Sequence, residues 1–271
     1  MSSGPFSLDE RVAVVTGGTG AIGAALAQSL AQAGARVAVL ARGEAALEHT
    51  VRKLTDDGHD AIGVRADVLD ASALEEGRDR ILDRFGAIDI LVNCAGGNVD
   101  GATLKDDASP FTLPIEAYRQ VLDLNLIGTL LPIQVFGGAM RSSAGCSIVN
   151  VSSMAATRAL TRVGGYAAAK AAIESVTRSL AVELARRGTG IRVNAIAPGF
   201  VIGEQNRALL MDEDGSLTER GAKIVAQTPL ARFGEPEDLV STVVWLSSEG
   251  ARFVTGIVVP VDGGFSAFSG V

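Results

Sequence analysis

The chain has 271 residues, of which 47% are hydrophobic and 20% charged, and its net charge is −7. This length and apolar content suit a single α/β domain and exclude a disordered chain or a coiled coil. The acidic balance argues against nucleic acid or an anionic membrane surface as a partner. It leaves room for a small anionic substrate beside a local arginine cluster.

The N-terminus lacks the basic and apolar regions of a secretory leader, and no uninterrupted apolar run reaches the ~18 residues that a membrane span needs. The two cysteines, Cys94 and Cys146, fall at opposite ends of neighbouring predicted strands, too far apart for a disulfide. Reduced cysteines are typical of the cytosol. We therefore expect a cytoplasmic protein that contacts neither membrane nor nucleic acid, and we predict no metal site.

Short apolar runs alternate with amphipathic stretches along the chain. The pattern predicts strands over 11–15, 37–41, 61–65, 88–92, 147–151, 191–196 and 256–259, and helices over 22–33, 44–54, 72–85, 115–140 and 166–187. This alternation predicts right-handed βαβ units. We expect one domain over 1–271: a Rossmann-like, doubly wound parallel sheet of about seven strands with helices on both faces. The polar segment at about 200–228 is the predicted substrate lid.

A glycine-rich turn follows the first predicted strand, where Gly18, Gly20 and Gly23 fit the pattern G-x-G-x-x-G. Glycines let the backbone approach a pyrophosphate, and the helix that opens there offers unpaired N–H groups. Its position between a strand and a helix supports a dinucleotide site. The predicted cofactor cradle is Thr16, Gly17, Gly18, Thr19, Gly20, Ala21, Ile22 and Gly23.

The end of the second strand bears on the choice between NAD and NADP. An acid there binds the ribose hydroxyl of NAD, whereas an arginine accommodates the 2′-phosphate of NADP. No acid stands at the strand tip, Arg42 follows it, and Glu44 lies in the next predicted helix. The sequence therefore favours NADP through Arg42. The alternative is that Arg42 is an ordinary solvated residue at a helix start.

A phenol and an ammonium stand four residues apart at Tyr166 and Lys170, on one face of a predicted helix. A tyrosine is a poor base at neutral pH, and a cation beside it favours the phenolate. Ser153, thirteen residues before Tyr166, offers a hydroxyl for a substrate oxygen. This pattern indicates acid/base chemistry at a carbonyl or alcohol.

These motifs resemble the short-chain dehydrogenase/reductase family over nearly the whole chain. The resemblance is carried by 16–23, Asn93-Cys94-Ala95-Gly96, Asn125, Ser153, Tyr166-x-x-x-Lys170, Pro198-Gly199 and Val261-Asp262-Gly263-Gly264. It implies a single Rossmann-like domain, NAD(P) chemistry and a homotetramer. The chain departs from the family pattern at Ala21, where a second glycine is usual, and at Cys94, where a second asparagine is usual.

The resemblance also implies a role for each matching residue. Tyr166 is the general acid/base, Lys170 lowers its pKa and binds the nicotinamide ribose, and Ser153 polarises the carbonyl. Asn125 holds a water that relays protons from Lys170. The remaining cofactor contacts implied are Asp67 and Val68 at the adenine, and Asn93, Ala95, Gly96, Pro198 and Gly199 along the cofactor.

Further segments resemble the D-mannonate oxidoreductase (fructuronate reductase) branch of that family. They are 125–132, 160–163, 204–207, 217–221 and 263–267. This branch implies D-fructuronate and D-mannonate as substrates and NAD as the usual cofactor, which opposes the indication from Arg42. A sugar acid needs a cation at its carboxylate, and a bidentate arginine suits it. We expect Arg162 and Arg207 to bind it, with Ser153 at the carbonyl. Arg162 could instead pair with a neighbouring subunit or with a lid carboxylate such as Glu204.

Two other functions stay open at this stage. The chain could reduce another carbonyl, such as a 3-oxoacyl thioester or a neutral polyol ketone, which needs no carboxylate clamp. It could also be a non-catalytic NAD(P)-binding regulator. Such a regulator would have no need of Tyr166 and Lys170, and both are present.

Overall fold

The computed structural model describes residues 4–105, 107–140 and 145–270 of the chain. Its centre is a sheet in which seven strands run parallel in the order β3-β2-β1-β4-β5-β6-β7. The strands are β1 Val12–Thr16, β2 Arg36–Ala41, β3 Ala61–Arg65, β4 Ile90–Asn93, β5 Ser147–Val151, β6 Arg192–Pro198 and β7 Val258–Val261. The predicted Rossmann-like parallel sheet is confirmed.

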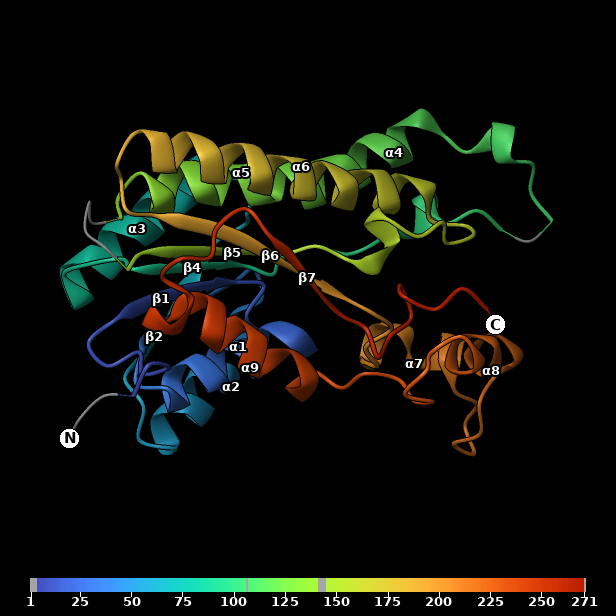
Figure 1. The fold of residues 1–271 in the computed structure, drawn as a ribbon, viewed down its shortest axis with the longest axis horizontal. Coiled ribbons are helices and arrows are strands. Elements are labelled where there is room, and N and C mark those ends of the chain that lie inside the picture. The colour runs from blue at the N-terminus through green and yellow to red at the C-terminus, as the bar shows by residue number, and fades with distance from the viewer. Residues whose placement is uncertain (1–3, 106, 141–144, 271) are drawn as a thin grey trace.

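Helices cover both faces of this sheet (Figure 1). One layer holds α1 Ala21–Gln32, α2 Glu44–Asp56 and α9 Glu237–Ser247; the other holds α3 Ala71–Phe85, α4 Ile115–Leu122, α5 Gly128–Pro132 and α6 Gly164–Arg186. Strands β1, β4, β5 and β6 are buried along their whole length. Their β-branched and apolar side chains fill two cores, one on each side of the sheet.

The predicted long helix over 115–140 is interrupted twice. After α4 the chain makes a wider π-helical turn at Asp123–Ile127, and after α5 a second one at Ile133–Gly137. In the first turn, Asn125 Nδ2 donates to the Val121 carbonyl at 2.9 Å. That carbonyl is the partner of the Asn125 backbone N–H in a regular α-helix, so the side chain competes for it and the turn widens.

The segment Ile115–Gly137 is long and apolar enough to cross a bilayer by length and composition, with a mean hydropathy of 1.2. In the fold it lies in the helical layer beside α3 and α6, and it carries the fully buried Asn125. We therefore describe it as a helical segment of the domain.

The sequence analysis missed helix α9 and the helices inside the predicted lid. In α9, Leu239, Val243 and Leu246 recur at helical spacing and pack into the core beside α1. That spacing was a signal in the sequence. The lid segment 200–228 forms α7 Glu204–Leu210 and α8 Glu219–Ala226 (Figure 1). Cys94 follows the carboxyl end of β4 and Cys146 precedes the amino end of β5, at opposite edges of the sheet as predicted.

Candidate active site

The candidate site lies at the carboxyl ends of the strands, where β1 and β4 are neighbours. The chain leaves β1 toward β2 and β3 and later returns to the other side of β1 as β4, which creates the crevice where α/β sheets bind ligands. Thr16 Oγ1 accepts hydrogen bonds from the backbone N–H groups of Cys94 at 3.1 Å and Ala95 at 3.2 Å. Thr16 thus ties the glycine-rich turn to the loop after β4.

The glycines of the cradle serve different purposes. A Cβ on Gly18 would lie 2.6 Å from Val39 Cγ1, and one on Gly23 would lie 2.2 Å from the Gly17 carbonyl oxygen. Gly17 has a φ of +64°, and a Cβ there would lie 2.7 Å from Ala95 Cα. A Cβ on Gly20 would meet only the Gly17 oxygen, at an ordinary 3.5 Å. Packing therefore requires three of these glycines. At Gly20, which is exposed, the absence of a side chain leaves the backbone open to close approach by a ligand.

This exposed backbone is the N-terminus of α1. Gly20 is its N-cap, no side chain caps the helix, and its first turn holds no acidic residue. Unpaired N–H groups and the positive end of the helix dipole therefore face the loop. These N–H donors, and the space left by the missing side chain at Gly20, fit the pyrophosphate of a dinucleotide. Ala21, exposed beside it, is close to Gly203 at the start of α7: a Cβ on Gly203 would lie 3.6 Å from the Ala21 methyl.

Helix α6 brings the predicted catalytic side chains together at the end of β5. The side chains of Tyr166 and Ser153 form a hydrogen bond. Lys170 Nζ lies 5.5 Å from the centre of the Tyr166 ring and donates to the Val151 carbonyl at 2.8 Å. The residues that the sequence analysis grouped as catalytic therefore meet in one place.

Burial controls the electrostatics of this cluster. It raises the pKa of Tyr166 above its usual value, and the Ser153 hydrogen bond only partly opposes that rise. Burial also lowers the pKa of Lys170 to about 8. Burial therefore outweighs the interactions that lower the phenol's pKa, and the predicted lowering of that pKa by Lys170 stays a prediction. The two groups are removed from water together, so desolvation, which favours the neutral phenol and the neutral amine, is the larger effect.

The Asn125 side chain positions the loop after β4. Its Oδ1 accepts from the Gly97 N–H at 3.0 Å, and its Nδ2 donates to the Gly97 carbonyl at 2.7 Å. A Cβ on Gly96 would lie 2.7 Å from Asn125 Oδ1 and 3.3 Å from Lys170 Nζ. Asn125 and Lys170 therefore converge on Gly96. The predicted role of Asn125 in holding a relay water stays a prediction.

Four charged residues surround the tip of β2. Arg42 Nη1 lies 3.7 Å from Asp67 Oδ2, with the two side chains 75% and 41% exposed. Arg65 Nε donates to the Arg42 carbonyl at 3.3 Å, and its Nη1 lies 3.7 Å from Glu44 Oε2. Arg65, the last residue of β3, is a second arginine that the sequence analysis missed. Val68 is buried against the position of Gly128.

Two of the predicted cofactor contacts make hydrogen bonds or close packing contacts within the fold. Asn93 Nδ2 donates to Asn150 Oδ1 at 2.9 Å inside the sheet. Gly199 follows Pro198 at the end of β6, where a Cβ would lie 2.7 Å from Asp262 Cα. Asp262 in turn accepts hydrogen bonds from two backbone N–H groups of the C-terminal segment, at 2.9 and 2.8 Å. The cofactor contacts themselves stay predictions.

The arginines expected at the substrate differ in their surroundings. Arg162 has a φ of +76°, and its Nε donates to the Leu104 carbonyl at 2.7 Å, while the Leu104 N–H donates to the Arg162 carbonyl at 2.9 Å. It therefore joins the loop before Tyr166 to the segment after β4. Arg207 lies on α7 with its side chain exposed. Arg158 donates to the Ser266 carbonyl.

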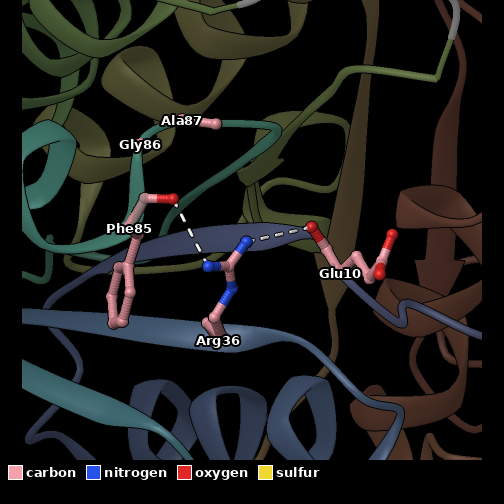
Figure 2. A pocket seen from close by; sticks show the side chains of 5 residues that line it. All are labelled: Glu10, Arg36, Phe85, Gly86 and Ala87. Atoms are coloured by element: carbon pink, nitrogen blue, oxygen red, sulfur yellow. Dashed lines mark hydrogen bonds between the residues drawn. The ribbon is translucent and has the colours of Figure 1, made fainter.

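A cavity of about 460 Å³ lies at the amino ends of the strands, opposite to the candidate active site (Figure 2). It is lined by Glu10, Arg36, Phe85, Gly86 and Ala87, and the Arg36 guanidinium donates across it to the carbonyls of Phe85 and Glu10 at 3.4 and 3.3 Å. Arg36 begins β2 and Glu10 precedes β1. The cavity is therefore remote from the carboxyl ends of the strands and from Tyr166.

The chain is similar to known oxidoreductases over nearly its whole length. A family model described as enoyl-(acyl carrier protein) reductase matches residues 18–266. An uncharacterized oxidoreductase of Bacillus subtilis (strain 168) is 44% identical over 98% of both chains. A crystal structure from Haemophilus influenzae, provisionally named a D-mannonate oxidoreductase and holding NAD, is 40% identical over 98% of both chains, with a TM-score of 0.91. A gluconate 5-dehydrogenase from Burkholderia cenocepacia J2315, in complex with NADP and tartrate, is 30% identical over 99% of this chain and 100% of that one, with a TM-score of 0.86.

Proposed function

The chain belongs to the short-chain dehydrogenase/reductase family of NAD(P)-dependent oxidoreductases, and we propose that within it the chain interconverts D-fructuronate and D-mannonate. The meeting of Ser153, Tyr166 and Lys170 at one end of β5 carries the chemistry. The substrate is supported by the similarity to the Haemophilus influenzae protein.

The catalytic residues act on the carbonyl oxygen. Bound at the α1 N-terminus, the nicotinamide cofactor supplies the hydride that reduces the carbonyl carbon. Tyr166 donates a proton to the oxygen, and its raised pKa keeps the phenol protonated at neutral pH. Ser153 donates a hydrogen bond to the same oxygen, and Lys170 binds the ribose. Proton transfer of this kind contributes about 10²–10⁴-fold to the rate.

We propose Arg162 and Arg207 as the residues that bind the sugar-acid carboxylate. A net charge of −7 repels such a substrate, so a local guanidinium must offset it. The loop of Arg162 borders Tyr166, and the hydrogen bond from Nε to Leu104 holds its guanidinium in place. Arg162→Met and Arg207→Met should each lower kcat/KM for D-fructuronate more than for its carboxamide. Equal losses on both substrates would leave the arginines as loop-ordering residues.

We propose that Arg42 contacts the 2′-phosphate of NADP. Both nearby carboxylates already lie close to a guanidinium: Asp67 is next to Arg42, and Glu44 is next to Arg65. The alternative is NAD, which the Haemophilus influenzae structure holds. Arg42→Ala should weaken NADP binding by about 1.5–3 kcal/mol and NAD binding much less. Arg187→Ala, which removes an exposed guanidinium paired with Glu183, is the matched control.

The experiment that tests the substrate is a panel assay. NADH and NADPH oxidation is followed with D-fructuronate, other keto sugar acids and a 3-oxoacyl thioester, with Tyr166→Phe as the inactive control. We expect the highest kcat/KM for D-fructuronate. A preference for the thioester would favour the second candidate, a 3-oxoacyl thioester reductase, which is supported by the 33% identity of this chain to a 3-oxoacyl-[acyl-carrier-protein] reductase of Synechocystis sp..

We also propose a homotetramer that acts in the cytoplasm. Large apolar side chains at the surface, such as Val182 on α6 at 59% and Phe253 at 101% exposure, are candidates for subunit contacts. Light scattering on the purified protein measures the oligomeric state, and cell fractionation tests the location. A monomer at micromolar concentration would contradict the assembly.

A further inference from the structure

Three consecutive residues at the end of β5 each bond a side chain of α6. The Val151 carbonyl accepts from Lys170 Nζ, and Ser153 bonds Tyr166. Between them stands Ser152, which has no part in the proposed reaction. Its hydroxyl makes a third bond to the same helix.

Ser152 Oγ donates to Glu174 Oε1 at 3.0 Å, and the two residues are only 2% and 5% exposed. Tyr166, Lys170 and Glu174 are spaced four residues apart, so they lie on one face of α6. The catalytic helix is therefore held against β5 by three adjacent contacts. Of these three contacts, the hydrogen bond between Glu174 and Ser152 is the one farthest from the reacting atoms.

The position of Ser152 determines that of its neighbour. The Ser152 N–H donates to the Ile196 carbonyl at 2.8 Å, so its backbone belongs to the sheet. Ser153 follows in extended conformation, with φ −165° and ψ 151°. One peptide unit joins Ser152 to Ser153. A change in the contact of the Ser152 side chain with α6 therefore shifts the position of the Ser153 hydroxyl.

We propose that Glu174 is a positioning residue: through its hydrogen bond to Ser152 it sets the distance between the Ser153 hydroxyl and the Tyr166 phenol. The proposal rests on the roles proposed above for Ser153 and Tyr166 and is independent of the sugar acid as substrate. Misplacing a reacting group by about 1 Å can lower a rate by roughly 10²-fold.

A purely structural role for Glu174 predicts a different result. Burying a carboxylate is unfavourable, and its second oxygen lies 3.7 Å from Nη1 of Arg178, whose side chain is 56% exposed. Ser152 Oγ also lies 3.4 Å from the Lys170 carbonyl, so it keeps an acceptor when methionine replaces Glu174, and the exposed Arg178 guanidinium stays hydrated. The variant Glu174→Met should therefore fold stably and still be impaired in turnover, whereas stability and turnover would change together if Glu174 served the fold alone.

The first readout is kinetic. With the substrate that the wild type reduces fastest in the panel above, Glu174→Met and Ser152→Ala should lower kcat about tenfold to a hundredfold. KM for the cofactor should stay unchanged, because the glycine-rich turn after β1 is untouched. Glu174→Gln keeps an acceptor oxygen and should restore most of kcat. The double variant should be no slower than Ser152→Ala, because that substitution already removes the bond to Glu174 together with the longer one, of 3.4 Å, to the Lys170 carbonyl.

The second readout needs neither substrate nor cofactor. The chain has two tyrosines, so a tyrosine-labelled sample gives two Cζ resonances, and Tyr166→Phe assigns them. Glu174→Met and Ser152→Ala should move the Tyr166 resonance in the same direction and leave that of Tyr118 in place. An unchanged Tyr166 resonance in either folded variant, or a wild-type kcat in either, would overturn the proposal. If Glu174→Met fails to fold, Ser152→Ala alone decides between these outcomes.

Discussion

The buried ammonium of Lys170 should make the stability of this protein depend on pH, and one substitution isolates that dependence. Burial lowers the pKa of Lys170 from 10.5 to about 8. Between these two pH values the unfolded chain binds more protons than the folded one, so the free energy of unfolding rises with pH. Below pH 8 both states are protonated, and the full destabilisation remains.

The size of the effect follows from the pKa change. At about 1.4 kcal/mol for each pH unit, the buried ammonium destabilises the fold by about 3 kcal/mol at pH 7. About 1 kcal/mol of this should be recovered by pH 9. Burial also raises the pKa of Cys94 to about 11, which lowers stability above pH 9. A comparison of two proteins that both contain Cys94 removes most of that contribution.

The assay is denaturant unfolding of the wild type and Lys170→Met at pH 7 and pH 9, at one protomer concentration. Methionine keeps the length of the side chain and does not titrate. The unfolding free energy of the wild type should rise by about 1 kcal/mol relative to the variant between the two pH values. Lys223→Met, which removes an exposed ammonium, is the control and should show no such change. An equal difference between wild type and Lys170→Met at both pH values would refute the reasoning.

The other predictions concern turnover, the cofactor cradle and the C-terminal segment. Tyr166→Phe should lower kcat by about 10²-fold or more with little change in cofactor Kd; a loss of less than about tenfold would exclude Tyr166 as the acid. Gly20→Ala should weaken cofactor binding without changing the melting temperature, whereas Gly23→Ala should destabilise the fold by about 1–3 kcal/mol or more, because its Cβ has no space. A melting temperature that falls equally in both would contradict this division. Asp262→Ala should cost about 1–3 kcal/mol, since two backbone N–H groups lose their acceptor; unfolding measurements showing no change would contradict it.

Local patterns were sufficient to predict the architecture and to place Tyr166 and Lys170 side by side in the candidate site. Alternation of apolar runs with amphipathic stretches predicted the parallel sheet, because each strand needs both faces covered. The spacing of Tyr166 and Lys170 placed two reactive groups on one helix face, since four residues make about one turn. Gly23 also followed from its motif, and the structure shows the close packing that excludes a Cβ there.

The sequence alone could not show how strongly burial acts on the site. Lys170 beside Tyr166 suggested a lowered phenol pKa, but a sequence does not reveal how much water each group loses on folding. The fold removes both from water, and desolvation then raises the pKa of Tyr166. The sequence also could not show that Arg162 donates a hydrogen bond to the Leu104 carbonyl, because Leu104 is 58 residues away in the chain.

Periodicity determined which residues share a helix face, and tertiary structure decided what that face meets. Tyr166, Lys170 and Glu174 could be placed on one side of a helix from their spacing alone. Only the docking of α6 on β5 put Glu174 against Ser152. The physical reason is that side-chain direction along a helix is a local property of the backbone, whereas burial and hydrogen-bond partners depend on elements that are brought together only when the chain folds.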